Sequence, residues 1–241
     1  MKLLILSDIH ANISALNAVL NDVKTYNIDK IILLGDHIDY CMRPNETIEI
    51  LKNLPGKADV NIWGNHEKAI FDEQLERFSS DRGRDFSRYT SNILNENSKN
   101  YLLNDMFTQG YSEKTYNEKY FLFIHGSLED VFWKSISYES ANENYLKYDF
   151  VVSGHSHRPN YFEKYFSFNN ADTRGKKRVV FINPGSVGQP RNHNPRACYA
   201  IIDTITESVH LNSTDYDIKA EQSLYVPEID EFYKTRLEKG I

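Results

Sequence analysis

The sequence predicts an α/β fold with a parallel sheet in its first third. Short apolar runs at 2–6, 30–35 and 58–64 are typical of buried strands, and two segments of helical periodicity separate them. Strands that alternate with helices along a chain form right-handed βαβ units and lie parallel in one sheet. A length of 241 residues suits one large domain, or one domain with a sizeable insertion. We therefore expect a single domain over residues 1–241.

The two helices of this first third are indicated by periodicity and by local start signals. Between 12 and 26, apolar side chains recur every three or four residues, which places them on one helix face. Asn12 stands directly before this pattern and is a favourable N-cap. Pro44 and Asn45 begin a second, short helix that continues to Leu51, because proline is favoured in the first turn of a helix.

A helical insertion is expected after the third strand, at about 72–110. Past residue 66 the chain becomes polar and keeps a helical periodicity. The stretch 79–85 interrupts this pattern, and residues 86–103 predict one or two further helices.

The second half of the chain predicts mainly strands. Two of them, at 112–117 and 119–126, are joined by a tight turn at Asn117-Glu118, and a helix is expected within 138–147. The close spacing of the remaining runs favours antiparallel pairing. These runs are 149–155, 160–168, 177–186, 197–203 and 206–212.

Composition and charge narrow the functional classes. The formal net charge of -6 argues against a protein that binds nucleic-acid backbones, although bound metal ions can still attract a small anionic substrate. The two cysteines, Cys41 and Cys198, do not indicate a disulfide framework. The apolar start of the chain is too short for a signal peptide, and no run approaches the ~20 apolar residues of a membrane span. We expect a cytoplasmic protein with no membrane partner.

Polar side chains follow five of the best predicted strands at the point where each strand ends. Since the loops beyond the carboxyl ends of strands form the binding crevice of α/β sheets, these side chains should share one edge. Five of the eight histidines of the chain lie in these positions. The residues are Asp8 and His10, Asp36 and Asp39, Asn65 and His66, His125, and His155 and His157.

A single Asp or His after a strand is usually a cap or a turn residue, but five strands ending in this way indicate a metal site. Imidazole, carboxylate and amide oxygen suit Mn²⁺, Fe or Zn²⁺. In an extended segment, alternate residues such as His155 and His157 point to the same side. Six or seven ligands are too many for one closed zinc site and suit two ions ~3.5–4 Å apart that share a carboxylate.

The motifs "SDIH", "GDHID", "GNHE", "IHG" and "GHSH" resemble, in the same order, those of the calcineurin-like metallophosphoesterase superfamily. The resemblance runs from residue 1 to about 205, and "NPGSVGQPR" at 183–191 is similar to the smaller bacterial and archaeal phosphodiesterase-type branch. It implies two facing mixed β-sheets flanked by helices, an α/β/β/α sandwich. It also implies two divalent metal ions, Mn²⁺ first, with Fe, Zn²⁺, Ni²⁺ or Co²⁺ as alternatives.

The resemblance also implies roles for individual residues. One metal would be bound by Asp8, His10, Asp36 and His157. The second would be bound by Asp36, Asn65, His125 and His155, with Asp36 as the bridge. His66 would serve the leaving group rather than a metal, oriented by Asp39, and a helix cap is its alternative role. Asn65 would also contact the substrate, and Arg191 is either a substrate clamp or a solvated turn residue.

Two departures from the superfamily pattern are visible. In its serine/threonine protein phosphatases the second Asp of the G-D-x-x-D motif precedes an Arg and a Gly, whereas here Asp39 precedes Tyr40 and Cys41. Ala11 stands where a glycine or asparagine is common, and it offers no ligand.

The predicted function is a metal-dependent hydrolase of phosphate esters, with a phosphodiesterase acting on small or nucleotide substrates as the main hypothesis. A phosphoprotein or phosphomonoester phosphatase is the alternative, weakened by Tyr40. A nuclease is weakened by the net charge. A non-catalytic scaffold of the same fold would have lost ligands, and here every ligand is present.

Overall fold

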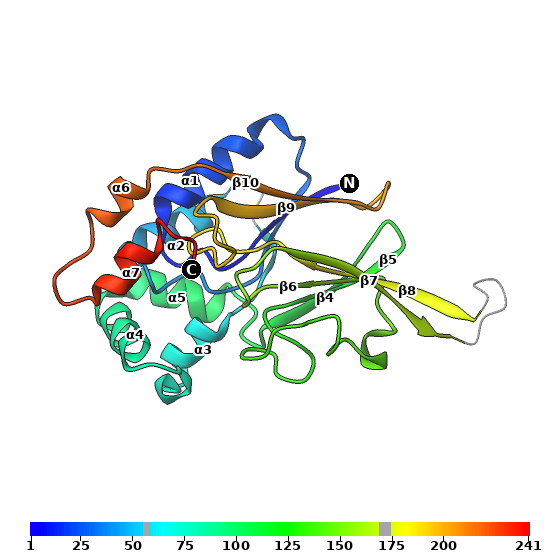
Figure 1. Cartoon of the computed structure of the whole chain (residues 1–241), viewed down its shortest axis with the longest axis horizontal. Helices are drawn as coiled ribbons and strands as arrows, with labels where there is room; N and C mark the ends of the chain where they lie inside the picture. The colour runs from blue at the N-terminus through cyan, green and yellow to red at the C-terminus, as the bar shows by residue number, and fades with distance from the viewer. Residues whose placement is uncertain (55–57, 169–174) are drawn as a thin grey trace.

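Two five-stranded sheets face each other in the computed structural model, which describes residues 1–54, 58–168 and 175–241. The strand order is β10-β9-β1-β2-β3 in the first sheet and β4-β5-β6-β8-β7 in the second. Helices lie mainly on the outer side of the first sheet (Figure 1). The structure thus confirms the α/β sandwich.

The first sheet contains the three parallel strands that the sequence predicts. They are β1 (Lys2–Leu6), β2 (Lys30–Leu33) and β3 (Ala58–Asn61). Helices α1 (Ile13–Asp22) and α2 (Pro44–Lys52) form the crossovers between them. The strand β9 (Ala197–Asp203) pairs antiparallel with β1 and carries β10 (Ser208–Thr214) on its other side.

The second sheet begins with a hairpin of β4 (Tyr111–Tyr116) and β5 (Lys119–Ile124). Asn117 and Glu118 connect them with φ values of 46° and 64°, the left-handed pair that a tight hairpin turn requires. Antiparallel pairing also joins β7 (Asn160–Ser167) to β8 (Lys176–Asn183). The expectation of antiparallel strands is wrong for β6 (Phe150–Ser153), which is parallel to both β5 and β8.

Side-chain alternation along the strands forms two cores on either side of the first sheet. Leu3 and Ile5 of β1 pack against Phe121 and Phe123 of β5, between the sheets. Leu4 and its neighbours in β1 and β2 face the helices instead. Each fully buried side chain of this size stabilises the fold by ~1.5–3 kcal/mol. A one-residue slip of β1 would exchange the two sets between the cores and disrupt the packing of both.

The segment 72–110, predicted as a helical insertion, contains a 3₁₀ helix, η2 (Leu75–Arg77), and the helices α4 (Asp81–Ile93) and α5 (Glu96–Asn104). The expected interruption at 79–85 is wrong, because α4 begins at Asp81. The Ser80 hydroxyl caps it by accepting a hydrogen bond from Gly83 N at 3.3 Å. The helix expected within 138–147 is only the 3₁₀ helix η3 (Glu143–Tyr145).

Two further helices follow the last strand and were not predicted. They are α6 (Ile218–Gln222) and α7 (Glu231–Arg236), and α7 lies beside α4 in Figure 1, with Tyr233 of α7 packed on Phe86 of α4. Leu237, just after α7, packs on Ala11 and Cys41 in the loops after β1 and β2. The C-terminal segment therefore covers the loops that carry the predicted site.

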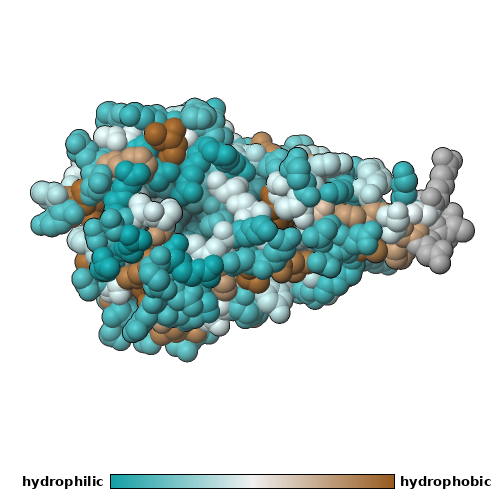
Figure 2. All heavy atoms as spheres, turned by 60° about the horizontal axis from the view of Figure 1, so that its bottom comes forward, coloured by the Kyte–Doolittle hydropathy of each residue, from teal (hydrophilic) through white to brown (hydrophobic). Residues whose placement is uncertain are grey.

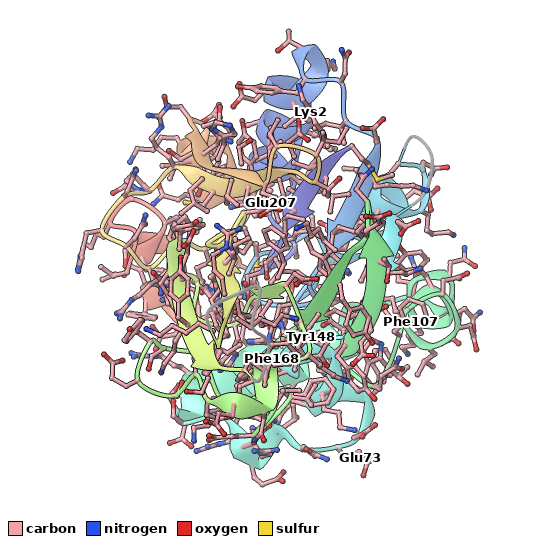
Figure 3. The ribbon with its side chains drawn as sticks, turned by 90° about the vertical axis from the view of Figure 1, so that its right-hand side faces the viewer. Lys2, Glu73, Phe107, Tyr148, Phe168 and Glu207 are labelled. Atoms are coloured by element: carbon pink, nitrogen blue, oxygen red, sulfur yellow. The ribbon has the colours of Figure 1, made fainter. Side chains whose placement is uncertain are left out.

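Two further views show the molecule from other sides. In Figure 3, Lys2 of the first sheet lies above and Phe168, just after β7, lies below. The face in Figure 2 is mostly hydrophilic, with hydrophobic groups scattered over it. None of the helices in the described ranges has both the length and the apolar character needed to cross a bilayer.

Candidate metal centre

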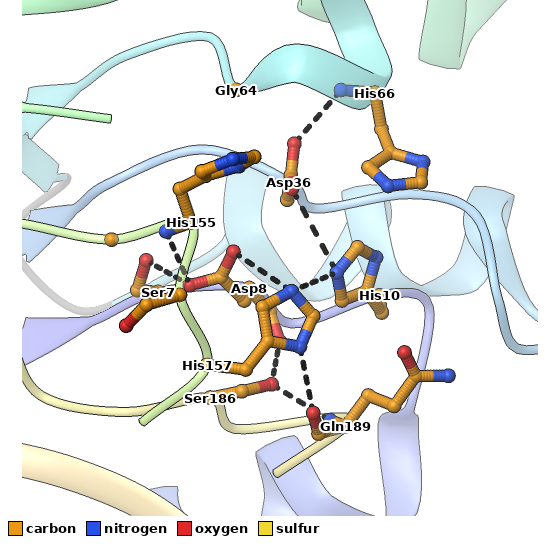
Figure 4. Close-up of polar contacts among 12 residues, drawn as sticks. Ser7, Asp8, His10, Asp36, Gly64, His66, His155, His157, Ser186 and Gln189 are labelled. Carbon is orange, nitrogen blue, oxygen red and sulfur yellow. Dashed lines mark hydrogen bonds and ion pairs between the residues drawn. The ribbon is translucent and has the colours of Figure 1, made fainter. Parts of the chain in front are cut away.

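The predicted ligands from both sheets meet at one edge of the sandwich (Figure 4). Six of them form two groups in which the possible ligand atoms all lie within 4.8 Å of one another. Asp36 belongs to both groups, and the seventh predicted ligand, Asn65, contacts two members of the second group. The first group is Asp8, His10, Asp36 and His157, and the second is Asp36, His125 and His155.

His10 and His157 face each other in a way that suits a bound cation. Nδ1 of His10 donates a hydrogen bond to Ile38 O at 3.1 Å, and Nδ1 of His157 donates to Gln189 O at 2.7 Å. Since the ring proton is on Nδ1 in both, each Nε2 carries a lone pair. Burial lowers the pKa of both imidazoles, which keeps them neutral. The two Nε2 atoms are nevertheless 3.2 Å apart, a position in which one metal ion could accept both lone pairs.

Within the described residues, Asp8 leaves one carboxylate oxygen free beside the same pair of imidazoles. Its Oδ2 accepts hydrogen bonds from Ser7 Oγ at 2.6 Å and from His155 N at 3.2 Å. Its Oδ1 is buried, lies 3.4 Å from His157 Nε2, and has no hydrogen-bond partner in the described ranges. Burial raises the pKa of Asp8 to about 7, so an ionised carboxylate here needs a positive charge beside it.

Asp36 lies between the two groups. Its Oδ1 accepts a hydrogen bond from His66 N at 2.9 Å. Its Oδ2 is 3.8 Å from His10 Nε2 and 3.4 Å from His125 Nε2. Burial raises the pKa of this carboxyl to about 7 as well. One oxygen is thus fixed by the backbone, and the other faces both sets of ligands.

The second group repeats the pattern of facing acceptors. His125 donates from Nδ1 to Leu34 O at 2.8 Å, so its Nε2 carries the lone pair, and this atom is 3.0 Å from Asn65 Oδ1. The same oxygen is 2.8 Å from His155 Nδ1. Four imidazoles, two carboxylates and an amide oxygen form a donor set that fits divalent metal ions.

The loops that carry these side chains adopt left-handed backbone conformations. Thirteen non-glycine residues among those described have a positive φ, and six of them are predicted site residues. Each such residue costs ~1–3 kcal/mol, which native proteins tolerate mainly where function requires it. Ala11 has a φ of 56°, which explains the preference for glycine or asparagine at this position. The six are Asp8, His10, Asp36, Asp39, His155 and His157.

Glu67 holds the loop after β2 in this conformation, and its role was not predicted. Its buried carboxylate accepts hydrogen bonds from the backbone N–H groups of Asp36 at 2.9 Å, His37 at 2.8 Å and Gly64 at 2.8 Å. The one sequence feature that could have indicated this role is the place of Glu67 as the final residue of the "GNHE" motif.

His66 lies beside the two groups and belongs to neither. Gly64 is the N-cap of α3 (Asn65–Phe71), so the imidazole does not cap the helix. Its Nδ1 is instead 2.6 Å from Asp39 Oδ2. Burial disfavours the imidazolium, but the carboxylates of Asp36 and Asp39 outweigh burial and raise the pKa of His66.

Asp39 is fixed by residues of α4 that the motifs do not contain. The Ser87 hydroxyl donates to Oδ2, and the Thr90 hydroxyl donates to Oδ1 at 2.9 Å. Both residues are buried and lie on one face of the helix. Their 87/90 spacing was the only signal in the sequence.

A cavity opens next to the predicted ligands. Asn65, His66, His155 and His157 line it, and Arg191 lies at its wall, where its backbone N donates to His157 O at 3.1 Å. Tyr40 also lines the cavity, and the wall is completed by side chains that the sequence did not indicate, chiefly Arg77, Phe78 and Trp133.

Residues 1–207 match the calcineurin-like phosphoesterase superfamily domain. The chain belongs to this superfamily. An uncharacterized protein of Methanocaldococcus jannaschii, MJ0912, is 30% identical over 221 residues, which is 89% of this chain and 88% of that protein. The match confirms the resemblance inferred from the five motifs.

Solved structures agree with the family assignment. A metallophosphoesterase from Sphaerobacter thermophilus is 28% identical with a TM-score of 0.77, and the match covers 100% of both chains. The hypothetical protein PH1004 from Pyrococcus horikoshii OT3 has the same fold, with a TM-score of 0.79 at 21% identity over 100% of this chain and 98% of that one. The chain is therefore a phosphoester hydrolase of the calcineurin-like superfamily, and its buried His and Asp groups could hold the divalent metals used by this superfamily.

Proposed function

We propose that this calcineurin-like hydrolase cleaves phosphodiesters of small or nucleotide substrates with two divalent metal ions. The contact that carries the proposal is the 3.2 Å approach of the unprotonated Nε2 atoms of His10 and His157. The first ion would be held by Asp8, His10, Asp36 and His157. The second would be held by Asp36, Asn65, His125 and His155, and Asp36 Oδ2 would bridge.

The nitrogen and oxygen donors support Mn²⁺ as the native metal, with Fe, Zn²⁺, Ni²⁺ or Co²⁺ as alternatives. When bound, the two ions supply Lewis acidity for a water nucleophile and positive charge for the phosphoryl oxygens. The side chains of Asn65 and Arg191, at the cavity wall, would bind the phosphoryl oxygens and orient the phosphorus.

His66 would deliver the proton that the leaving oxygen needs. Because Asp39 engages Nδ1, the ring presents Nε2 to the cavity, and the carboxylate stabilises the protonated ring before transfer. Asp39 therefore orients His66 without itself touching the substrate.

The charges at the cavity support a diester over a monoester. Of the two arginines that line it, Arg77 is paired with Asp130 at 2.9 Å, which leaves Arg191 to meet the phosphate. One free guanidinium suits the single negative charge of a diester, whereas a monoester carries nearly two charges at neutral pH. A phosphomonoester or phosphoprotein phosphatase is the alternative.

The test compares bis-p-nitrophenyl phosphate with p-nitrophenyl phosphate, using protein whose metal content has been measured after loading with Mn²⁺. A higher kcat/KM for the diester supports the proposal, and a preference for the monoester supports the alternative. Two bound metals without turnover of any phosphate ester would instead indicate a scaffold.

We also propose that the chain is one domain over 1–241 and that it acts in the cytoplasm. The free, buried thiols of Cys41 and Cys198 support the second point, because secreted domains tend to oxidise their cysteines.

A further inference from the structure

Tyr40 lies between a predicted metal ligand and the predicted proton donor. Its ring centroid is 4.7 Å from that of His10 and 4.4 Å from that of His66. The residue is 8% exposed, and it forms part of the wall of the cavity that also contains Asn65 and Arg191. The side chain therefore faces the place where a phosphate would be bound.

The Tyr40 hydroxyl is a free donor in this wall. Within residues 1–54, 58–168 and 175–241 the hydroxyl makes no hydrogen bond. It is also not fully enclosed by protein atoms, so a ligand can reach it. Because Tyr40 lines the cavity, its hydroxyl can donate a hydrogen bond to a ligand bound there. A phenol has a pKa of ~10 and stays protonated at neutral pH, so it offers an O–H to an anionic oxygen.

Among the described residues, Arg191 in the same cavity wall also has an unpaired hydrogen-bond donor. Nε of Arg191 is buried without a hydrogen-bond partner in the described part of the chain. Tyr40 and Arg191 thus present one neutral and one charged donor to a single cavity, next to the two predicted metal groups. Oxygens of one phosphoryl group match such a set of donors.

The C-terminal segment, which follows the matched superfamily domain, holds Tyr40 in place. Tyr40 has a φ of 63°, which is costly for a bulky residue. Its carbonyl accepts a hydrogen bond from the Tyr225 hydroxyl at 2.6 Å. Its ring stacks on Tyr233 of α7, with centroids 4.9 Å apart and planes 21° apart. Both partners lie beyond residue 207, where the superfamily match ends.

From these contacts we infer that Tyr40 binds the phosphoryl group of the substrate through its hydroxyl and that Tyr225 positions it from the C-terminal segment. The inference rests on the proposed phosphoesterase site. It gives the segment after residue 207 a role in substrate binding. The Tyr40 hydroxyl, a neutral donor, would bind the same phosphoryl group as the charged side chain of Arg191.

The first test is Tyr40→Phe, which removes only the hydroxyl. With Mn²⁺ loaded, two metals should remain bound, while calorimetry should show that inorganic phosphate binds about tenfold to a hundredfold more weakly, as expected for a hydrogen bond to a charged group. The kcat/KM for bis-p-nitrophenyl phosphate should fall by a similar factor. Tyr138→Phe is the matched control, because Tyr138 is 53% exposed and does not line the cavity.

The second test is a double-mutant cycle with Tyr225→Phe, which removes the hydrogen bond to the Tyr40 carbonyl. Alone, this change should weaken phosphate binding less than Tyr40→Phe does. In the Tyr40→Phe background it should add almost nothing, because the hydroxyl that it positions is absent. Additive losses would show that Tyr225 acts on the fold in general, and would overturn its positioning role.

Two results would overturn the role of Tyr40. They are phosphate affinity within about twofold of the wild type, and loss of metal in the Tyr40→Phe protein. Failure of the proposed function has a different signature: the wild type would hydrolyse no phosphate ester but would still bind phosphate through Tyr40. No phosphate binding by the metal-loaded wild type would overturn both.

Discussion

Nδ1 of His66 and Oδ2 of Asp39 are 2.6 Å apart, and this contact joins the loop after β2 to the first turn of α3. The hydroxyls of Ser87 and Thr90 approach the same carboxylate from α4. Helix α4 thus helps to orient the predicted proton donor, although it supplies none of the predicted metal ligands.

Replacing His66 by alanine should reduce turnover by ~10²–10⁴-fold, the usual contribution of general acid-base catalysis, while both metals stay bound. The loss should be smaller for a p-nitrophenyl ester than for an alkyl ester, because p-nitrophenolate leaves with little protonation. Steady-state kinetics on both esters, together with metal analysis, would check this. A near-normal rate for His66→Asn on the alkyl ester would reject the role.

Changes that disturb the Asp39 carboxylate or the hydroxyls that fix it should reduce turnover less than the loss of His66 does. Asp39→Asn should lower turnover less than His66→Ala does. Ser87→Ala should lower it by a few-fold, because it removes one hydroxyl that fixes the Asp39 carboxylate while the Thr90 hydroxyl and the His66 ring still contact it. Ser91→Ala, on the same helix, is the control. Equal rates for the Ser87 and Ser91 variants on an alkyl ester would count against the positioning of Asp39 by α4.

Asp36→Asn should lower the content of both metals as well as the rate. The change removes the negative charge from Oδ2, the atom that faces His10 and His125. Elemental analysis after Mn²⁺ loading and gel filtration would measure the occupancy. If the variant retained two metals per chain, Asp36 would not be the bridge.

Chelation should abolish hydrolysis, and Mn²⁺ should restore it. The ions should also stabilise the fold, because they bind ligands that the unfolded chain does not bring together. At 100 times the dissociation constant a single bound ion adds ~2.7 kcal/mol to the free energy of unfolding. Thermal melts with and without Mn²⁺ would show this shift, and full activity in verified metal-free protein would contradict the mechanism.

Glu67→Gln should lower the free energy of unfolding by about 3 kcal/mol or more, because several buried N–H groups lose a charged acceptor. The amide can accept through only one oxygen, and its NH₂ group faces other donors. Urea denaturation would measure the loss. Glu76→Gln, at an exposed position, is the control and should be nearly neutral.

The parts of the site that could be predicted are those fixed by local sequence. Asp8 and Asp36 each follow an apolar strand of the first sheet, and strand ends at one sheet edge must lie together. His155 follows β6 of the second sheet, and the resemblance to the superfamily placed it beside them. The chemistry of their side chains then indicates a metal. Parallel packing of β1, β2 and β3 followed from the same pattern.

The parts that could not be predicted depend on contacts between distant segments. Tyr225 meets Tyr40 across 185 positions of the sequence, and no periodicity in either segment encodes that contact. The start of α4 was misjudged because Gly83 and its polar neighbours resemble a loop, whereas the Ser80 cap and the packing of Phe86 favour a helix. The 3₁₀ helix η3 is one turn long, which is too short to leave a periodic signal.

Each metal group takes ligands from both sheets, and this arrangement affects how the protein matures. His10 and His157 are 147 positions apart, so the unfolded chain gains little by gathering them around an ion, since closing so long a loop is entropically unfavourable. The apoprotein must first pair its strands and close the sandwich. Binding of the proposed metals would then follow folding and join two sheets that are already formed, so a cell short of the metal would accumulate a folded but inactive enzyme.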